Sequence, residues 1–176
     1  MAEAETKPLS RSEREAQIKD KAGLVIVIMA LFMAITTYFS NNYSGAVLKN
    51  TLKATDTYAF YQAKSIKQSI AEGQMEDAKD PKRIRELAAR IERYESDPVK
   101  KEGKRELLAR AQAYEAARDE ASQHNPWLTF ASMAFQLAIV LLSASILAVN
   151  NRMYKISEVV AVIGIVLLSQ GIWLWF

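Results

Sequence analysis

The sequence has no cysteine and only one histidine, His124, among 176 residues. Disulfide bonds, thiol catalysis and cysteine-based metal sites are therefore excluded, and a transition-metal site would depend on carboxylates alone. Glycine-rich phosphate loops and serine-nucleophile motifs are also missing. These absences favour a protein that is not an enzyme and binds no cofactor or metal. We expect His124 to lie at an interface or at a helix start.

Charged residues are missing from two long apolar runs, residues 22–39 and 126–149, and a third run, residues 156–176, has only Glu158. Each run is near the length that crosses a bilayer. Three buried helices of a soluble protein are the alternative, but they would take up too much of so small a chain. The first run is longer than a signal-peptide core and is followed by no typical cleavage site, so we expect an uncleaved anchor.

Lysine and arginine set the expected orientation in the membrane. They are enriched in the N-terminal tail and between the second and third runs, which places both segments in the cytoplasm. The middle segment then faces outward; it is also basic, but it is longer than the loops that this rule governs. We predict a multi-pass protein of the bacterial inner membrane, with the tryptophans near the C-terminus at the outer interface. Its parts are a cytoplasmic tail 1–21, transmembrane helices 22–39, 126–149 and 156–176, a cytoplasmic loop 150–155 and a periplasmic segment 40–125.

Proline marks the helix starts expected in the middle segment. Residues 46–79 contain no proline and one glycine, which favours one long helix. Asp80-Pro81, Asp97-Pro98 and Asn125-Pro126 each place a good N-cap residue before a proline, which suits the first helical turn. We expect a second helix after Asp80, a third segment that starts or bends at Asp97, and a second span that begins at Asn125. The predicted fold is all-α, with a long antiparallel helical hairpin between spans one and two.

Apolar residues recur every three or four positions on both arms of this hairpin, which predicts where the arms meet. On the outgoing arm the expected seam is Leu48, Leu52, Thr55, Ala59, Gln62, Ile66 and Ile70. On the return arm it is Ile84, Leu87, Ile91, Tyr94, Leu107, Ala111, Tyr114, Ala117 and Ala121.

Two further faces of the outgoing helix lie outside that seam on a helical wheel. A basic stripe has Lys49, Lys53, Phe60, Lys64 and Lys67, and an aromatic strip has Val47, Ala54, Tyr58, Tyr61 and Ser65. Because a two-helix hairpin buries only one seam, we expect the aromatic strip to contact another copy, another protein or a bent return arm. Half-exposed tyrosines and a membrane-surface helix are the alternatives. The interface candidates are Tyr58, Tyr61, Ile66, Lys64 and Lys67.

A nucleic-acid partner is not expected, because the net charge is only +3 and acidic residues occur throughout the middle segment. The expected partners are membrane lipids and either further copies of the chain or other membrane-protein subunits.

The stretch Tyr61-Gln62-Ala63-Lys64-Ser65-Ile66-Lys67 resembles a sequence of an uncharacterised bacterial family of small membrane proteins, a domain-of-unknown-function family. Members of that family carry Tyr-Gln-Ala-Lys-x-Ile-Lys shortly after a first span. The resemblance implies a helical middle segment followed by two closing spans, and it implies no activity.

Polar residues within the apolar runs suggest how the spans pack. Gln136 and Gln170 have similar depths in antiparallel spans, so we predict a hydrogen bond between them, with a pore lining as the functional alternative. Glu158 lies about one turn into the third run; we predict an interfacial ion pair with Lys155, although an intramembrane acid is also a functional candidate. Small residues that would let the helices approach closely are Ala131, Ala134, Ala138 and Ser145.

The function expected from this layout is that of a structural or assembly subunit of a membrane complex, which self-associates through its spans and its outward hairpin. A component of an oligomeric channel or transporter is one alternative, although a charged relay is missing. A membrane sensor is the other, but the expected cytoplasmic segments are too short for an output domain.

Overall fold

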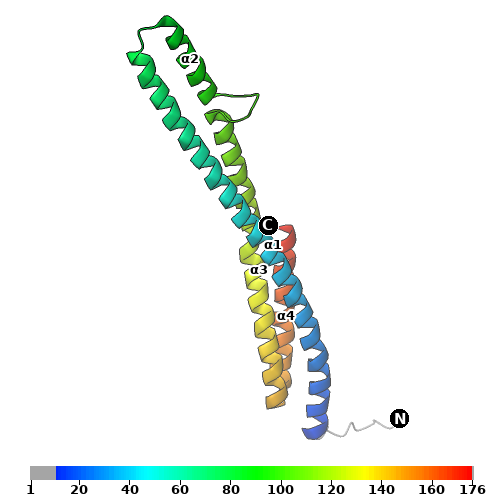
Figure 1. The fold of residues 1–176 in the computed structure, drawn as a ribbon. Helices are drawn as coiled ribbons and strands as arrows, with labels where there is room; N and C mark the ends of the chain where they lie inside the picture. The colour runs from blue at the N-terminus through cyan, green and yellow to red at the C-terminus, as the bar shows by residue number, and fades with distance from the viewer. Residues whose placement is uncertain (1–10, 176) are drawn as a thin grey trace, which may run out of the picture. The chain divides into compact units, whose positions relative to one another are not determined.

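The computed structural model describes residues 11–175, and these form four helices (Figure 1). Their bounds are α1 Arg11–Asp77, α2 Pro81–Glu95, α3 Lys104–Ala148 and α4 Asn151–Trp173. The helices α1, α3 and α4 are long and apolar enough to cross a membrane. The prediction of an all-helical chain with three such helices is therefore confirmed. Phe176 lies outside the described residues.

The chain divides into two compact units. One consists of Met1–Tyr43 and Gln123–Phe176, and the other of Ser44–Ser122. We call the first the apolar unit and the second the hairpin unit. Both α1 and α3 pass from one unit to the other, while α4 belongs to the apolar unit and α2 to the hairpin unit.

Small and large side chains together form the contact between α3 and α4 in the apolar unit. Apart from Gln170, the buried positions alternate spacings of three and four, as in helices that pack along a heptad seam. They are Leu128, Ala131, Phe135, Ala138, Leu142 and Ser145 on α3, and Ser157, Ala161, Gly164, Leu168 and Gly171 on α4. Three members of the predicted small-residue strip are fully buried and Ala134 is partly buried, so that prediction is confirmed.

Two glycines of α4 provide the room that the larger side chains of α3 need. A Cβ atom on Gly164 would lie 2.7 Å from a ring carbon of Phe135, and one on Gly171 would lie 2.8 Å from a methyl carbon of Leu128. The Phe135 ring also stacks on Phe32 of α1, with ring centroids 5.8 Å apart. All three helices of the apolar unit thus meet at Phe135.

The connection between α3 and α4 consists of two residues. Val149 has a left-handed backbone (φ 49°), and the N–H of Asn150 bonds the carbonyl of Ser145 at 3.1 Å. The Asn150 side chain then caps α4 by accepting from the N–H of Arg152 at 2.9 Å. Most of the predicted loop 150–155 is therefore the first turn of α4.

The three proline-containing pairs behave differently. Asp80-Pro81 starts α2 as predicted, because the Asp80 carboxylate accepts from the N–H of Lys82 at 3.0 Å and the proline occupies the first turn. Asp97-Pro98 lies in the link between α2 and α3 and starts a turn, while α3 itself begins at Lys104.

The prediction that a helix begins at Asn125 is wrong, because α3 continues through Pro126. An internal proline removes one backbone hydrogen bond and costs roughly 3 kcal/mol. Long helical segments on both sides of Pro126 offset that loss, since the helix is packed within each unit. Asp80 differs from Asn125 because the preceding helix, α1, has already ended at Asp77. Its backbone is extended, as is usual for an N-cap residue, so a new helix starts there.

In the hairpin unit, α2 and the first part of α3 return alongside the second part of α1 (Figure 1). The predicted seam of the return arm is confirmed. Leu87, Leu107, Ala111 and Ala121 are buried, and Ile84, Ile91, Tyr94, Tyr114 and Ala117 are partly buried.

The predicted seam of the outgoing arm is wrong. Leu48, Leu52, Ile66 and Ile70 are exposed, each with more than half of its surface accessible. The buried positions on this arm are instead Ala54, Thr57 and Ala71. Both faces have helical spacing and lie about 180° apart around the helix, so spacing could not distinguish them. Small residues fill the contact because they let α1 approach the alanines of α3.

Candidate functional site

The tyrosines of the aromatic strip belong to the contact between the two arms. The Tyr58 hydroxyl donates to a carboxylate oxygen of Glu115 on α3 at 2.9 Å. The ammonium of Lys104 lies over the Tyr61 ring, 6.0 Å from its centroid. Of the three contacts expected for the aromatic strip, the structure shows the one with the return arm of the same hairpin. The hydrogen bond to Glu115 raises the pKa of Tyr58, because the carboxylate favours the protonated phenol.

The opposite face of the same helix is left uncovered in the hairpin unit. We define the exposed seam as the residues of the predicted outgoing seam, which are all exposed: Leu48, Leu52, Thr55, Ala59, Gln62, Ile66 and Ile70. The interface candidate Ile66 belongs to this seam and is 62% exposed. Isolated exposed aliphatic residues are common, but a continuous row over about three heptads is the pattern of a helix–helix interface.

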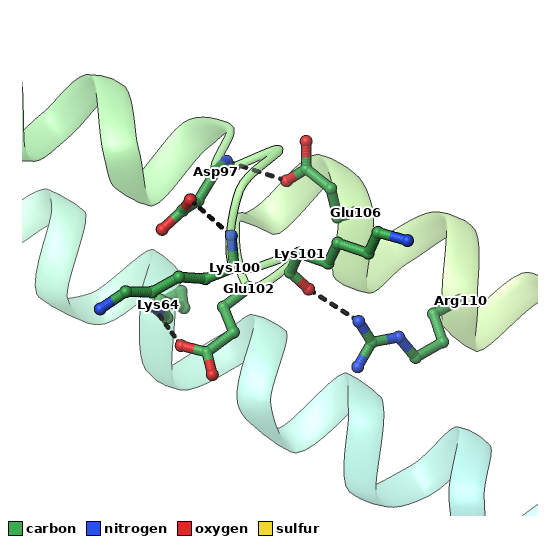
Figure 2. A network of polar contacts seen from close by, with 7 residues as sticks. All are labelled: Lys64, Asp97, Lys100, Lys101, Glu102, Glu106 and Arg110. Atoms are coloured by element: carbon green, nitrogen blue, oxygen red, sulfur yellow. Dashed lines mark hydrogen bonds and ion pairs between the residues drawn. The ribbon is translucent and has the colours of Figure 1, made fainter.

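The basic stripe forms one wall of a groove in the hairpin unit. This basic groove has a volume of about 320 Å³ and is lined by Phe60, Lys64, Lys67, Glu102, Leu107 and Arg110. The interface candidates Lys64 and Lys67 thus lie together, and both belong to the seven-residue stretch that carries the family resemblance. Figure 2 shows Lys64 and Arg110 approaching the link between α2 and α3 from two different helices.

A network of polar contacts fixes the link that closes the groove (Figure 2). The Glu106 carboxylate accepts from the Ser96 hydroxyl at 2.7 Å and from the N–H of Asp97 at 3.1 Å. These two hydrogen bonds hold the pKa of Glu106 below its ordinary value, the Ser96 bond contributing most. Gly103 has no space for a side chain, since a Cβ there would lie 2.5 Å from the Asp97 nitrogen.

The same link brings its carbonyl and carboxylate groups to the groove. An N–H of the Arg110 guanidinium donates to the Lys101 carbonyl at 2.7 Å, and Lys101 has a left-handed backbone (φ 55°). The Lys64 ammonium lies 3.8 Å from the Glu102 carboxylate and 5.6 Å from the centre of the Tyr94 ring. Lys67 makes no hydrogen bond or ion pair with the described part of the chain.

The single histidine joins the three helices of the apolar unit. The His124 ring stacks on Tyr43 of α1 with centroids 3.9 Å apart and planes 5° from parallel. Its Nδ1 lies 2.8 Å from the Gly171 carbonyl, so the proton of this hydrogen bond must be on Nδ1. That carbonyl is in the last turn of α4, where carbonyls lack partners within the helix. His124 therefore has a packing role at an interface between helices, in the middle of α3.

The predicted pairing of Gln136 with Gln170 is wrong. Gln136 is exposed and donates to the Ser132 hydroxyl at 3.2 Å on its own helix. Gln170 is buried, and its side-chain oxygen accepts from the N–H of Trp175 at 3.0 Å. Gln170 thus fixes the position of Trp175, which follows the left-handed cap residue of α4, Leu174.

The predicted ion pair of Glu158 with Lys155 is also wrong. The Glu158 carboxylate is exposed and forms no ion pair with Lys155 among the described residues, although both side chains line the same shallow pocket on α4. The functional reading of Glu158 stays a prediction.

A second groove, in the apolar unit, is lined mainly by hydroxyl and amide groups. It has a volume of about 220 Å³, and its polar lining residues are Thr36, Thr37, Ser40, Asn41, Thr129, Ser132 and Gln136. Several of these hydroxyls bond the carbonyl four residues earlier in their own helix, which leaves their oxygen atoms able to accept a further hydrogen bond. We call this the polar groove.

Sequence reasoning found one wall of the basic groove and missed the other. Lys64, Lys67 and Phe60 stood out as a stripe, whereas Glu102 and Arg110 were not singled out as site residues. The available signal was the eight-residue link 96–103, which joins two helices and is rich in lysine.

The described residues define an all-helical protein with three helices of membrane-spanning length and a hairpin unit between the first two. The family model described as "Domain of unknown function (DUF4337)" matches residues 18–174. The chain therefore belongs to this family, which confirms the predicted resemblance. No curated protein and no solved structure matches the chain.

Proposed function

We propose that this protein is a self-associating structural subunit of a complex in the bacterial inner membrane. The observation that carries this proposal is the exposed seam of the hairpin unit. Leu48, Leu52, Ile66 and Ile70 leave more than half of their surface accessible on one face of a well-formed helix. Exposed apolar rows of this kind mark protein–protein contacts in soluble segments.

A second copy of this chain is the partner that the seam fits best. Its spacing alternates between four and three residues from Leu48 to Ile66, which is the heptad repeat of a two-stranded coiled coil. Seams of this kind are self-complementary, so each copy offers the other the same row. The seam extends over about 33 Å at 1.5 Å per residue, which is long enough for about three heptads.

The charges beside the seam favour two copies that run in the same direction. One flank carries Lys49, Asp56 and Lys67, and the other carries the uncharged Thr51 and Ser69. In a parallel pair related by two-fold symmetry, the charged flank of one helix faces the uncharged flank of its partner. Like charges then do not meet. Two copies anchored in one membrane share that direction.

The test is native mass measured on protein in lipid nanodiscs, for the wild type and for Leu52→Asp with Ile66→Asp. We expect a dimer or larger assembly that the double variant dissociates, because two carboxylates would be buried in the seam. Helix content should change little, since both residues are exposed. The matched control is Gln112→Asp with Ala113→Asp on an exposed face of α3. A monomeric wild type, or a double variant that assembles normally, would contradict the proposal.

Cross-linking gives a second, independent readout, because the chain has no cysteine of its own. Ile66→Cys should form a disulfide between copies under mild oxidation, whereas Gln112→Cys should not. Cross-linking of both variants to the same extent would indicate random collision.

The orientation proposed is that of a cytoplasmic N-terminus and a periplasmic hairpin unit, supported by the lysine and arginine of residues 1–21 and 150–155. Ser69 is exposed in the hairpin unit, so Ser69→Cys should react with a membrane-impermeant thiol reagent in intact spheroplasts. Reaction only after lysis would reverse the orientation.

A component of an oligomeric channel is the second candidate, and the polar groove is the observation that favours it. Hydroxyl and amide groups facing lipid are costly unless another helix or water meets them. Several copies could turn these groups toward a common axis. Ion or solute flux into liposomes that contain the protein, lost in Gln136→Leu, would support this candidate, and absence of flux would count against it.

A further inference from the structure

We propose that the basic groove of the hairpin unit binds a phosphate monoester that carries a small apolar group. This site goes beyond the proposed self-association, and its Lys67 also belongs to the charged flank of the exposed seam. Its walls come from three segments: Phe60, Lys64 and Lys67 from α1, Glu102 from the link, and Leu107 and Arg110 from α3.

The charge of the groove matches a dianionic group. Three cationic side chains face one carboxylate, which leaves a local charge of +2 on the lining. A phosphate monoester carries between one and a half and two negative charges at neutral pH. Arginine and lysine are the side chains that usually bind phosphate, arginine through its fork of N–H groups and lysine as a point charge.

Donor capacity remains in the groove after its internal contacts are counted. Arg110 is held by the Lys101 carbonyl through one of its nitrogen atoms, Nη2, although a guanidinium has five N–H donors. Lys67 has no hydrogen bond or ion pair with residues 11–175. Lys64 is paired with Glu102 at 3.8 Å, which is long for an ion pair, and the Glu102 side chain is 60% exposed. That carboxylate can move aside when an anion enters.

The link between α2 and α3 preorganises this arrangement (Figure 2). Glu106 holds the start of the link through Ser96 and Asp97, and the Asp97 carboxylate accepts from the N–H of Lys100 at 3.0 Å. The Lys101 carbonyl is thereby fixed where it orients Arg110. A binding site held in place before the ligand arrives loses less entropy on binding.

The apolar part of the ligand is indicated by the rest of the lining. Phe60 is 65% exposed, and Leu107 is buried at the base of the groove. The volume of about 320 Å³ is at the lower end of the range for small-molecule sites. It suits a phosphate monoester of a small aliphatic or aromatic alcohol. A phosphate monoester occurs both in soluble phosphate esters and as the head group of phosphatidic acid.

The test is calorimetric titration of the full chain in a maltoside detergent, with phenyl phosphate and with dihexanoyl phosphatidic acid as the two probes. Binding of either probe supports the site, and the tighter of the two identifies its source as soluble or lipid. Lys67→Ala should weaken binding about tenfold or more, because it removes a charge-assisted hydrogen bond. Glu102→Gln should strengthen binding severalfold, because it frees Lys64 and removes the competing negative charge.

The control for general electrostatic attraction is Lys49→Ala, which removes the same charge from the same helix outside the groove. It should leave the affinity unchanged. Equal losses in Lys49→Ala and Lys67→Ala would overturn the proposal, as would the failure of both probes to bind. Tighter binding of benzoate than of phenyl phosphate would overturn the assignment to phosphate. Because Lys67 is exposed and makes no hydrogen bond or ion pair with the described residues, its loss should not affect folding.

Discussion

Substitution of Gly164 by alanine tests whether α4 packs on α3 as closely as the structure indicates. The new Cβ would lie 2.7 and 2.9 Å from two carbons of the Phe135 ring, well inside van der Waals contact. Phe135 is fully buried and stacked on Phe32, so its ring has little freedom to move away. Overpacking of a filled core typically costs about 1–3 kcal/mol.

The matched control is Gly23→Ala in α1, where a Cβ would meet nothing within 4 Å. Replacing glycine by alanine within a helix is intrinsically favourable by about 1 kcal/mol, and this gain is common to both variants. The difference between the two free energies of unfolding therefore isolates the overpacking, and we expect Gly164→Ala to be less stable than Gly23→Ala by about 1–3 kcal/mol.

The assay is unfolding by sodium dodecyl sulfate in mixed micelles, followed by far-ultraviolet circular dichroism. A smaller side chain at residue 135 should relieve the clash with the new methyl group. Phe135→Leu combined with Gly164→Ala should therefore be more stable than the sum of the two single effects predicts. Equal stability of Gly164→Ala and Gly23→Ala, or strict additivity with Phe135→Leu, would refute the close contact of α3 with α4.

Three further predictions follow from local contacts. The pKa of Glu106 is lower in the folded protein than in the unfolded one, so its stabilisation is present above its ordinary pKa and is lost as the pH falls through the folded value. Acid should therefore lower the protection of the amides in residues 96–103, measured as exchange relative to the intrinsic rate at each pH, and Glu106→Gln should remove this acid-dependent loss of protection. His124→Phe keeps the stacking on Tyr43 but loses the hydrogen bond to the Gly171 carbonyl, so the free energy of unfolding should fall by about 0.5–1.5 kcal/mol in the same assay. An unchanged free energy of unfolding would mean that stacking alone accounts for the contribution of His124. Val149→Gly should stabilise the turn between α3 and α4 by about 1 kcal/mol, because glycine adopts the left-handed backbone without strain, and a destabilised variant would contradict that backbone.

The sequence alone determined which segments are helical and which are apolar. Long runs without charge gave the three candidate spans, because a helix that crosses a bilayer must be apolar along its whole length. Asp80-Pro81 predicted the start of α2 correctly, because a cap and a proline act on the backbone within one turn. The return arm of the hairpin was also predicted correctly, since the apolar row chosen on it is the one that the structure buries.

Only the tertiary structure decided which side of α1 faces its partner. Leu48 and Ile66 are larger and more apolar than Ala54 and Ala71, yet the alanines are buried and the larger residues are exposed. Helical spacing gives the angle between residues but not the distance between helices, and a close approach favours small side chains. The glutamines were misassigned because their depths differ: Gly171 lies against Leu128 and Gly164 against Phe135, so Gln170 is about seven residues from the level of Gln136 along the helix pair.

The basic groove shows the same limit of prediction from sequence. Lys64 and Lys67 share a stripe that is visible in the sequence, but Glu102 and Arg110 lie about 40 residues further along the chain. They reach the stripe only because the hairpin folds back and the link 96–103 is held by Glu106. Contacts within one helix follow from its regular geometry, whereas contacts between distant segments depend on how loops and side-chain packing bring the segments together.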